Sequence, residues 1–175
     1  MIQSQKKPDT GVKLVTNQGY NILIDLEDAE FVKGLTLCKE EKDYFSIRNG
    51  PYRDEKLHRI IAKRAGKDCS NQIDHDNGDK FDMRRSNLRP ATNGQNRANS
   101  KLNSNNQSGY KGVHWKVNRN GTGCWYAQIN FESQKIYLGR FEIAEDAARA
   151  YDSAARRMFG EFATLNFPPE VIHES

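Results

Sequence analysis

The sequence predicts an α+β protein built from two small modules. Apolar residues make up 36% of the 175 residues and the mean hydropathy is -0.89, which leaves too little apolar material for one large core. Aromatic residues, at 10%, argue against a wholly disordered chain. Strand-like runs occupy the first part of the chain, and three more such runs precede an amphipathic helix in the last part. We therefore expect a small N-terminal sheet leading into a central core, then a three-stranded antiparallel sheet packed on one helix.

The N-terminal segment, residues 1–56, is expected to be rich in β-structure. Strand-like runs at 20–24 and 44–47 lie on either side of the acidic stretch 25–30, which predicts a small sheet with one short helix. Apolar residues then recur with helical spacing over residues 57–65. This spacing predicts that a helix opens the central core.

A linker and a second module are expected beyond the central core. Six asparagines occur between Asn93 and Asn106 with little apolar content, and we place the linker at 102–107. Strands are then predicted at 109–115, 124–131 and 135–141. Alanines and other apolar residues share one stripe over residues 144–159, which predicts a helix that lies close against the sheet.

Positive charge is concentrated in the middle of the chain. Residues 56–119 hold 14 Lys and Arg against 5 Asp and Glu, whereas both flanks are acidic, and this pattern suits a nucleic acid. No apolar run approaches the roughly 20 residues that span a bilayer, and no signal peptide is recognisable. We therefore expect a cytoplasmic protein with no membrane partner and no evident protein partner. The three cysteines are isolated, so neither a disulfide framework nor a Cys-x-x-Cys zinc site is supported.

The densest group of chemically active side chains lies between residues 73 and 96. It combines the carboxylate of Asp74 and the imidazole of His75 with the amides of Asn87 and Asn96. Hydrolysis of a phosphodiester needs an activated water and a countercharge, which one general base and one divalent ion can supply. Carboxylate and amide oxygens suit magnesium or manganese. A polar turn is the alternative interpretation of such a string, but the later amides favour a catalytic site.

These residues resemble the HNH nuclease family of phages and mobile elements. The matching pieces are His58-Arg59, Asp74-His75, Gly78, Asn87-Leu88 and Gln95-Asn96. The resemblance implies a ββα-metal core over residues 57–101. It further implies that His75 is the general base and that Asn87 steadies the loop and the base. Asp74 and Asn96 would bind magnesium or manganese, with zinc less favoured.

Two positions depart from the HNH pattern. Asn96 stands where the motif often ends in His, which is common in the intron-associated branch and favours magnesium or manganese over zinc. Met83 stands where this branch usually has Asn, so hydrogen bonding in the loop is expected to be weaker there. His58 is expected to be a structural helix residue rather than a metal ligand.

Side-chain alternation along the predicted sheet separates a helix-facing side from an outward side. If Trp125, Ala127, Ile129 and Phe131 face the helix, their neighbours face outward. The outward residues, together with those of the first strand, are Lys111, His114, Lys116, Tyr126, Gln128, Asn130, Lys135 and Tyr137. Amides suit adenine edges, cations suit phosphates or guanine, and rings stack on bases. An ordinary solvated sheet face is the alternative interpretation.

Residues 108–168 resemble the plant ethylene-response-factor, or Apetala-type (AP2/ERF), DNA-binding domain. The matching pieces are residues 108–113, 125–129, 137–141, 147–152 and 165–167. The resemblance implies that the sheet, not the helix, lies in the major groove. Members of that family often carry Arg at the positions of Lys111 and His114 and an acidic residue at that of Gln128. The plant target preference is therefore not expected here.

Together the two resemblances imply a homing-type HNH endonuclease that hydrolyses double-stranded DNA at a preferred site in a phage or bacterial host cell. Arg84, Arg97 and Lys101 complete the predicted DNA contacts, and residues 169–175 are a predicted tail. The main alternative is a catalytically silent, sequence-specific DNA-binding protein or transcriptional regulator. An RNA-directed protein is disfavoured because the major groove of RNA is deep and narrow.

Overall fold

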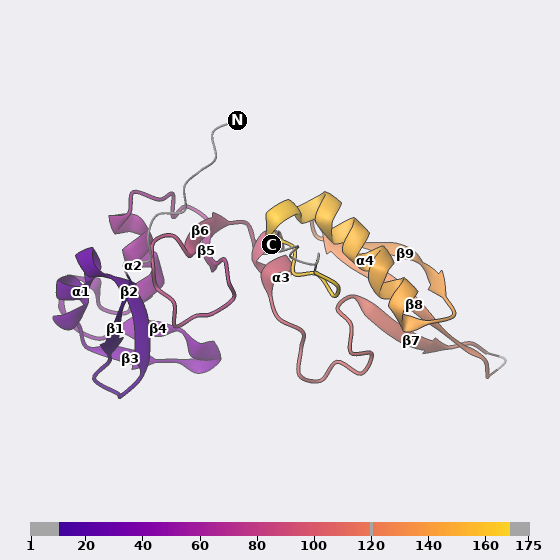
Figure 1. The fold of residues 1–175 in the computed structure, drawn as a ribbon, viewed down its shortest axis with the longest axis horizontal. Coiled ribbons are helices and arrows are strands. Elements are labelled where there is room, and N and C mark those ends of the chain that lie inside the picture. The colour runs from indigo at the N-terminus through magenta and orange to yellow at the C-terminus, as the bar shows by residue number, and fades with distance from the viewer. Residues whose placement is uncertain (1–10, 120, 169–175) are drawn as a thin grey trace, which may run out of the picture. The chain divides into compact units, whose positions relative to one another are not determined.

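The computed structural model describes residues 11–119 and 121–168 in two compact units, the first ending at Ala91 and the second starting at Thr92 (Figure 1). The predicted tail at 169–175 and the first ten residues lie outside the described residues. Both units combine helices with small antiparallel sheets, which confirms the α+β class. Within the described ranges, no helix has the length and apolar content needed to cross a membrane.

The first unit contains two-stranded antiparallel sheets and helices around one apolar core. Its elements are β1 (Gly11–Val15), β2 (Asn21–Asp25), α1 (Leu26–Lys33), β3 (Leu37–Lys39), η1 (Glu41–Asp43), β4 (Phe45–Ile47), η2 (Gly50–Tyr52), α2 (Leu57–Arg64), β5 (Gln72–His75) and β6 (Leu88–Ala91). The predicted runs correspond to β2, α1, β4 and α2. Ile24 of β2, Phe45 of β4 and Ile61 of α2 are fully buried in the shared core.

A ββα-metal core over residues 57–101 is not shown. β5 and β6 pair antiparallel, with His75 opposite Leu88, but the next helix, α3 (Asn93–Asn99), belongs to the second unit. Ala98 of α3 is 5% exposed and lies in one apolar cluster with Phe159. The backbone N–H of Thr164 donates to the carbonyl of Ala98 at 3.1 Å. The predicted linker therefore follows a helix that already packs within the second unit.

The second unit is a three-stranded antiparallel sheet covered on one face by a long helix (Figure 1). Its remaining elements are β7 (Val113–Val117), β8 (Gly123–Phe131), β9 (Gln134–Phe141), α4 (Ala144–Phe159) and η3 (Gly160–Phe162), with strand order β7-β8-β9. Trp125, Ala127, Ile129 and Phe131 belong to the clusters that α4 closes, which confirms the predicted alternation along β8. Buried alanines let α4 lie close to the sheet.

One extra residue interrupts the alternation along β9. Ala127 of β8 pairs with Gly139, whereas the next residue, Gln128, pairs with Tyr137. Gly139 has a φ of 136°, which favours glycine and is typical of a β-bulge. Beyond the bulge Phe141 packs into the core, and Arg140 is exposed opposite Tyr126. The bulge therefore decides which side of the sheet the end of β9 presents.

Candidate nucleic-acid interface and the predicted nuclease site

The sheet face opposite α4 carries a row of aromatic rings, one from each strand. His114 on β7 pairs with Tyr126 on β8, and their rings stack with centroids 5.4 Å apart. Tyr137 on β9 continues the row, with its centroid 6.4 Å from that of Tyr126. Tyr137 is 56% exposed. The row offers flat apolar surface to a base or a sugar.

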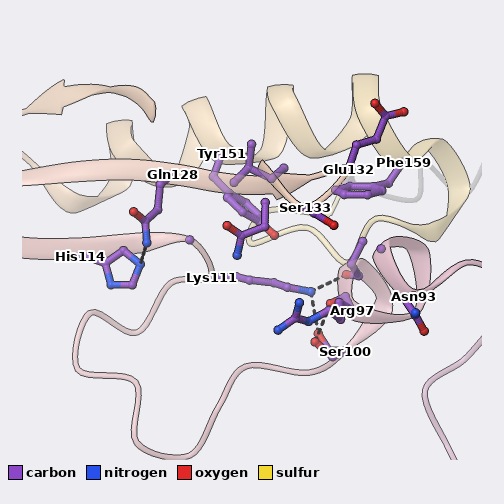
Figure 2. Close-up of a pocket in the computed structure, with 15 residues that line it drawn as sticks. Asn93, Arg97, Ser100, Lys111, His114, Gln128, Glu132, Ser133, Tyr151 and Phe159 are labelled. Carbon is purple, nitrogen blue, oxygen red and sulfur yellow. Dashed lines mark hydrogen bonds between the residues drawn. The ribbon is translucent and has the colours of Figure 1, made fainter. Parts of the chain in front are cut away.

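A hydrogen bond joins His114 to Gln128 beside this row. The amide nitrogen of Gln128 lies 3.0 Å from Nε2 of His114 (Figure 2). An amide nitrogen only donates, so Nε2 accepts and the ring carries its proton on Nδ1. Burial, and to a smaller extent the charge of Lys135, lowers the pKa of His114 below its usual value. The neutral ring therefore holds the Gln128 amide in one orientation at pH 7.

Three cations surround the rings on the same face. By strand pairing, Lys116 lies opposite Cys124, Lys135 opposite Asn130 and Arg140 opposite Tyr126. None of the three forms an ion pair with a carboxylate of the described residues. Sequence reasoning missed Arg140, because strict alternation puts it on the helix-facing side. A glycine inside a strand was the available signal, since it often marks a bulge.

Lys111 was predicted on this face, but its ammonium group points to α3 (Figure 2). Nζ donates to the carbonyl of Ser100 at 2.7 Å and to that of Ala98. Burial lowers the pKa of Lys111 to about 8. The lysine therefore holds the C-terminal end of α3 inside the second unit.

The other predicted DNA contacts fall into two classes. Arg84, in the first unit, pairs with Asp82 at 2.7 Å and its side chain is 22% exposed. Arg97 on α3 and Lys101 beyond it are exposed, and neither forms an ion pair with a carboxylate of the described residues. Arg84 is therefore engaged within the protein, whereas Arg97 and Lys101 present their charge to solvent.

Asp74 and His75, the predicted metal ligand and general base, are buried in the first unit. Asp74 is 5% exposed, and its Oδ2 accepts from Nη2 of Arg89 at 3.2 Å. His75 is 3% exposed, and its ring lies 5.3 Å from that of His58 and 6.3 Å from that of Tyr44, between centroids. Burial, with a smaller effect from the charge of Lys80, lowers the pKa of His75 to about 4. His58 is 6% exposed on α2.

Asn87 bridges the two ends of the loop between β5 and β6. Its Nδ2 donates to the carbonyl of Asp82 at 2.8 Å, and its Oδ1 accepts from the backbone N–H of Asn77 at 3.0 Å. Both bonds hold the turn that follows His75. The resemblance implies that Asn87 steadies the loop and the base, and this role stays a prediction.

The last two residues of the motif lie on α3, in the second unit. Gln95 forms a capping box with Thr92: each side chain accepts from the backbone N–H of the other residue, at 2.8 and 3.2 Å. This pair begins α3, so helix capping accounts for Gln95 at this position. Asn96 follows it, and so belongs to a different unit from Asp74.

The residues present do not favour the predicted metal site. Among the described residues no group of three or more His, Cys, Asp or Glu is placed to hold a metal ion. The carboxylate of Asp74 instead faces the guanidinium of Arg89, a cation that competes with any metal for the same oxygens. Magnesium or manganese binding stays a prediction.

Comparison with known proteins finds relatives that match part of the chain. Ethylene-responsive transcription factor 3 of Nicotiana tabacum is 39% identical over 72 residues, 39% of this chain and 32% of the relative. Dehydration-responsive element-binding protein 2A of Arabidopsis thaliana is 38% identical over 66 residues, 37% of this chain and 18% of the relative. The AP2/ERF and B3 domain-containing transcription repressor TEM1 of Arabidopsis thaliana is 44% identical over 64 residues, 37% of this chain and 17% of the relative. The chain thus spans about a third or less of these relatives. No protein-family model matches the chain.

These relatives correct the predicted activity. Their names describe transcription factors, a repressor and an element-binding protein, which contradicts the prediction of an HNH homing endonuclease and hydrolase. They support the resemblance of the C-terminal module to the AP2/ERF domain, and nothing supports the HNH resemblance. The alternative, a DNA-binding regulator without catalysis, fits the findings better.

Proposed function

We propose that the chain is a sequence-specific double-stranded DNA-binding protein that regulates transcription, and that the outward face of the β7-β8-β9 sheet reads the duplex. One observation carries the proposal: α4 seals one side of the sheet, and the other side is left with exposed rings, amides and cations. The names of the relatives, transcription factors and an element-binding protein, support the same function.

The chemistry of the face matches the two tasks of such a protein. Lys116, Lys135 and Arg140 attract phosphates and position the duplex, which carries no sequence information by itself. Gln128 and Asn130 have amides that pair with the N6 and N7 edge of adenine in the major groove. That groove admits β-strands, whereas the major groove of RNA is too narrow. The face therefore suits B-form DNA.

A regulator acts by occupying its site, so neither hydrolysis nor a metal is required of this face. A transcriptional function also places the protein in the compartment that holds the genomic DNA. The plant origin of the relatives supports that compartment in place of the predicted phage or bacterial cytoplasm.

The proposal is tested by selecting duplexes from a randomised pool with the wild-type chain and measuring affinity for a selected and a random duplex. Gln128→Ala and Asn130→Ala should each lower the preference for the selected duplex, because a good base-edge contact is worth about 1–3 kcal/mol. Lys116→Ala, the control, should weaken both duplexes alike and reduce the slope of log affinity against log salt by about one unit. Failure to enrich any sequence, or equal binding of duplex RNA, contradicts the proposal.

A further inference from the structure

A cleft of about 420 Å³ lies between α3 and the outward sheet face of the second unit (Figure 2). His114, Gln128 and Asn130 line it from the sheet, and Asn93 and Arg97 line it from α3. Three residues of the proposed reading face therefore also form one wall of the cleft. The cleft therefore adjoins that face, and Ile129, Tyr151 and Phe159 add apolar groups to its lining.

α3 is fixed firmly enough to serve as the opposite wall. Ala98 is buried in the cluster that contains Phe159, and Oγ1 of Thr164 donates to the carbonyl of Asn99 at 2.9 Å. Gly94 packs close to Phe159, since a Cβ added there would lie 3.6 Å from the ring. The ammonium group of Lys111 holds the last carbonyls of the helix. Apolar packing and hydrogen bonds thus fix α3 from both sides.

The lining of the cleft suits an anionic chain. Arg97 is exposed, and no carboxylate of the described residues forms an ion pair with it. Amides of Asn93, Gln128 and Asn130 add neutral donors, and Glu132 is the acidic residue among the lining side chains. A guanidinium with free donors beside neutral amides is an arrangement that binds phosphate well.

We propose that this cleft binds the sugar–phosphate backbone of one strand of the duplex that lies on the sheet, with Arg97 as the phosphate ligand. The proposal rests on the proposed function, and it adds a contact from a helix outside residues 108–168, the segment that resembles the AP2/ERF domain. Arg97 fixes the position of the duplex on the sheet, while Gln128 and Asn130 supply discrimination. The α3 segment is accordingly part of the DNA-binding surface.

The test compares full-length Arg97→Gln with Arg156→Gln, the matched control. Arg156 is an exposed arginine on α4, the helix on the other side of the sheet. For a duplex selected by the wild-type chain, Arg97→Gln should reduce the slope of log affinity against log salt by about one unit, and Arg156→Gln should leave it unchanged. Arg97→Lys keeps the charge and should restore most of the slope. The ratio of selected to random affinity should stay near the wild-type value in all three variants.

A second measurement locates the contact on the DNA. A neutral methylphosphonate replaces one phosphate of the selected duplex at a time. At the phosphate that Arg97 contacts, this replacement should weaken binding of the wild type but leave binding of Arg97→Gln unchanged. Equal slopes for Arg97→Gln and Arg156→Gln, or a phosphate profile that Arg97→Gln leaves unchanged, overturn the cleft proposal while DNA binding by the sheet stands. If the wild type enriches no duplex from the pool, both the proposed function and this inference fail.

Discussion

At the scale of single residues, the location of a cation matters more than the number of cations nearby. Every Lys and Arg between residues 56 and 89 pairs with a carboxylate or donates to a carbonyl of the first unit. Much of the basic middle of the sequence therefore holds the protein's own loops. The cations suited to phosphates are those without a described ion pair on the sheet face, on α3 and just beyond α3: Arg97, Lys101, Lys116, Lys135 and Arg140.

Acidification should weaken sequence discrimination through His114. The pKa of the ring is lowered from the usual 6.5, so the ring is neutral at pH 7. It takes up a proton as the pH falls through this lowered pKa. A protonated Nε2 cannot accept from Gln128, so the amide must turn and present its other atom to the base edge. The ratio of affinities for selected and random duplexes, measured from about pH 7.5 to about pH 5, should fall in the wild type.

The control for this effect is His114→Gln, which has no titrating ring. Its affinity ratio should stay constant over the same pH range, whatever its absolute value. A wild-type ratio that stays constant while the His114 ring takes up its proton would mean that His114 does not set the orientation of Gln128.

At the scale of elements, the sequence predicts those with a long, regular pattern. α4 has the predicted bounds, and β8 and β9 differ from prediction by a residue at one end, because alternation and the alanine stripe persist over many residues. β1 and β3 were missed, since both strands are only partly buried and their apolar pattern is correspondingly weak. α3 begins at a capping box on Thr92 in the structure, but the sequence does not show that Ala98 packs against Phe159, and so the predicted domain boundary lies beyond the observed one.

Gly112→Ala should destabilise the second unit through the loop that enters β7. Gly112 has a φ of 75°, and an added Cβ would lie 2.0 Å from Cδ2 of Tyr151 and 2.8 Å from the carbonyl oxygen of Gln128. Overpacking and a left-handed backbone together should lower the free energy of unfolding by about 3 kcal/mol. Both tryptophans, Trp115 and Trp125, lie in this unit, so their fluorescence in a urea titration reports its unfolding.

Gly121→Ala separates the two causes. Gly121 has a similar φ of 82°, but an added Cβ meets nothing within 4 Å, so only the backbone cost of about 1 kcal/mol should appear. Equal losses in the two variants would rule out the contact with Tyr151 as the main cause.

At the scale of the whole molecule, two units with separate cores explain why only part of the candidate site was predictable. The outward sheet face follows from alternation within one strand, which a sequence displays directly. The predicted nuclease site combined Asp74 with Asn96, which belong to different units. The burial of Asp74 and its contact with Arg89 come from tertiary packing. A string of Asp, His and Asn shows which side chains are present, but not which of them reach solvent.

The two units should also respond differently to acid. Burial lowers the pKa of His58 to about 3 and that of His75 to about 4. Both rings therefore stay neutral in the folded first unit at pH values where the unfolded chain takes up protons, below about pH 6.5. The free energy of unfolding of this unit should therefore fall as the pH drops from about 6.5 toward about 4, on the order of 3 kcal/mol per histidine. The proton resonances of His58 and His75 follow the first unit, and tryptophan fluorescence follows the second.

His58→Gln provides the control for the acid response. Removing one titrating ring should flatten the dependence of stability on pH in the first unit, even if the variant is less stable at every pH. A slope equal to that of the wild type would show that His58 already takes up its proton in the folded state.

Because of the bulge at Gly139, the number of residues in β9, and not only their identity, decides which side chains lie on the outward face of the sheet. Side chains alternate between the two faces of a strand, so loss of one residue there would exchange the faces of every residue that follows. Arg140 would turn toward the apolar interior and Phe141 toward the outward face of the sheet. Deletion of one residue at the bulge would therefore place an aromatic ring where the proposed DNA-binding face now carries a cation, although neither Arg140 nor Phe141 is itself substituted.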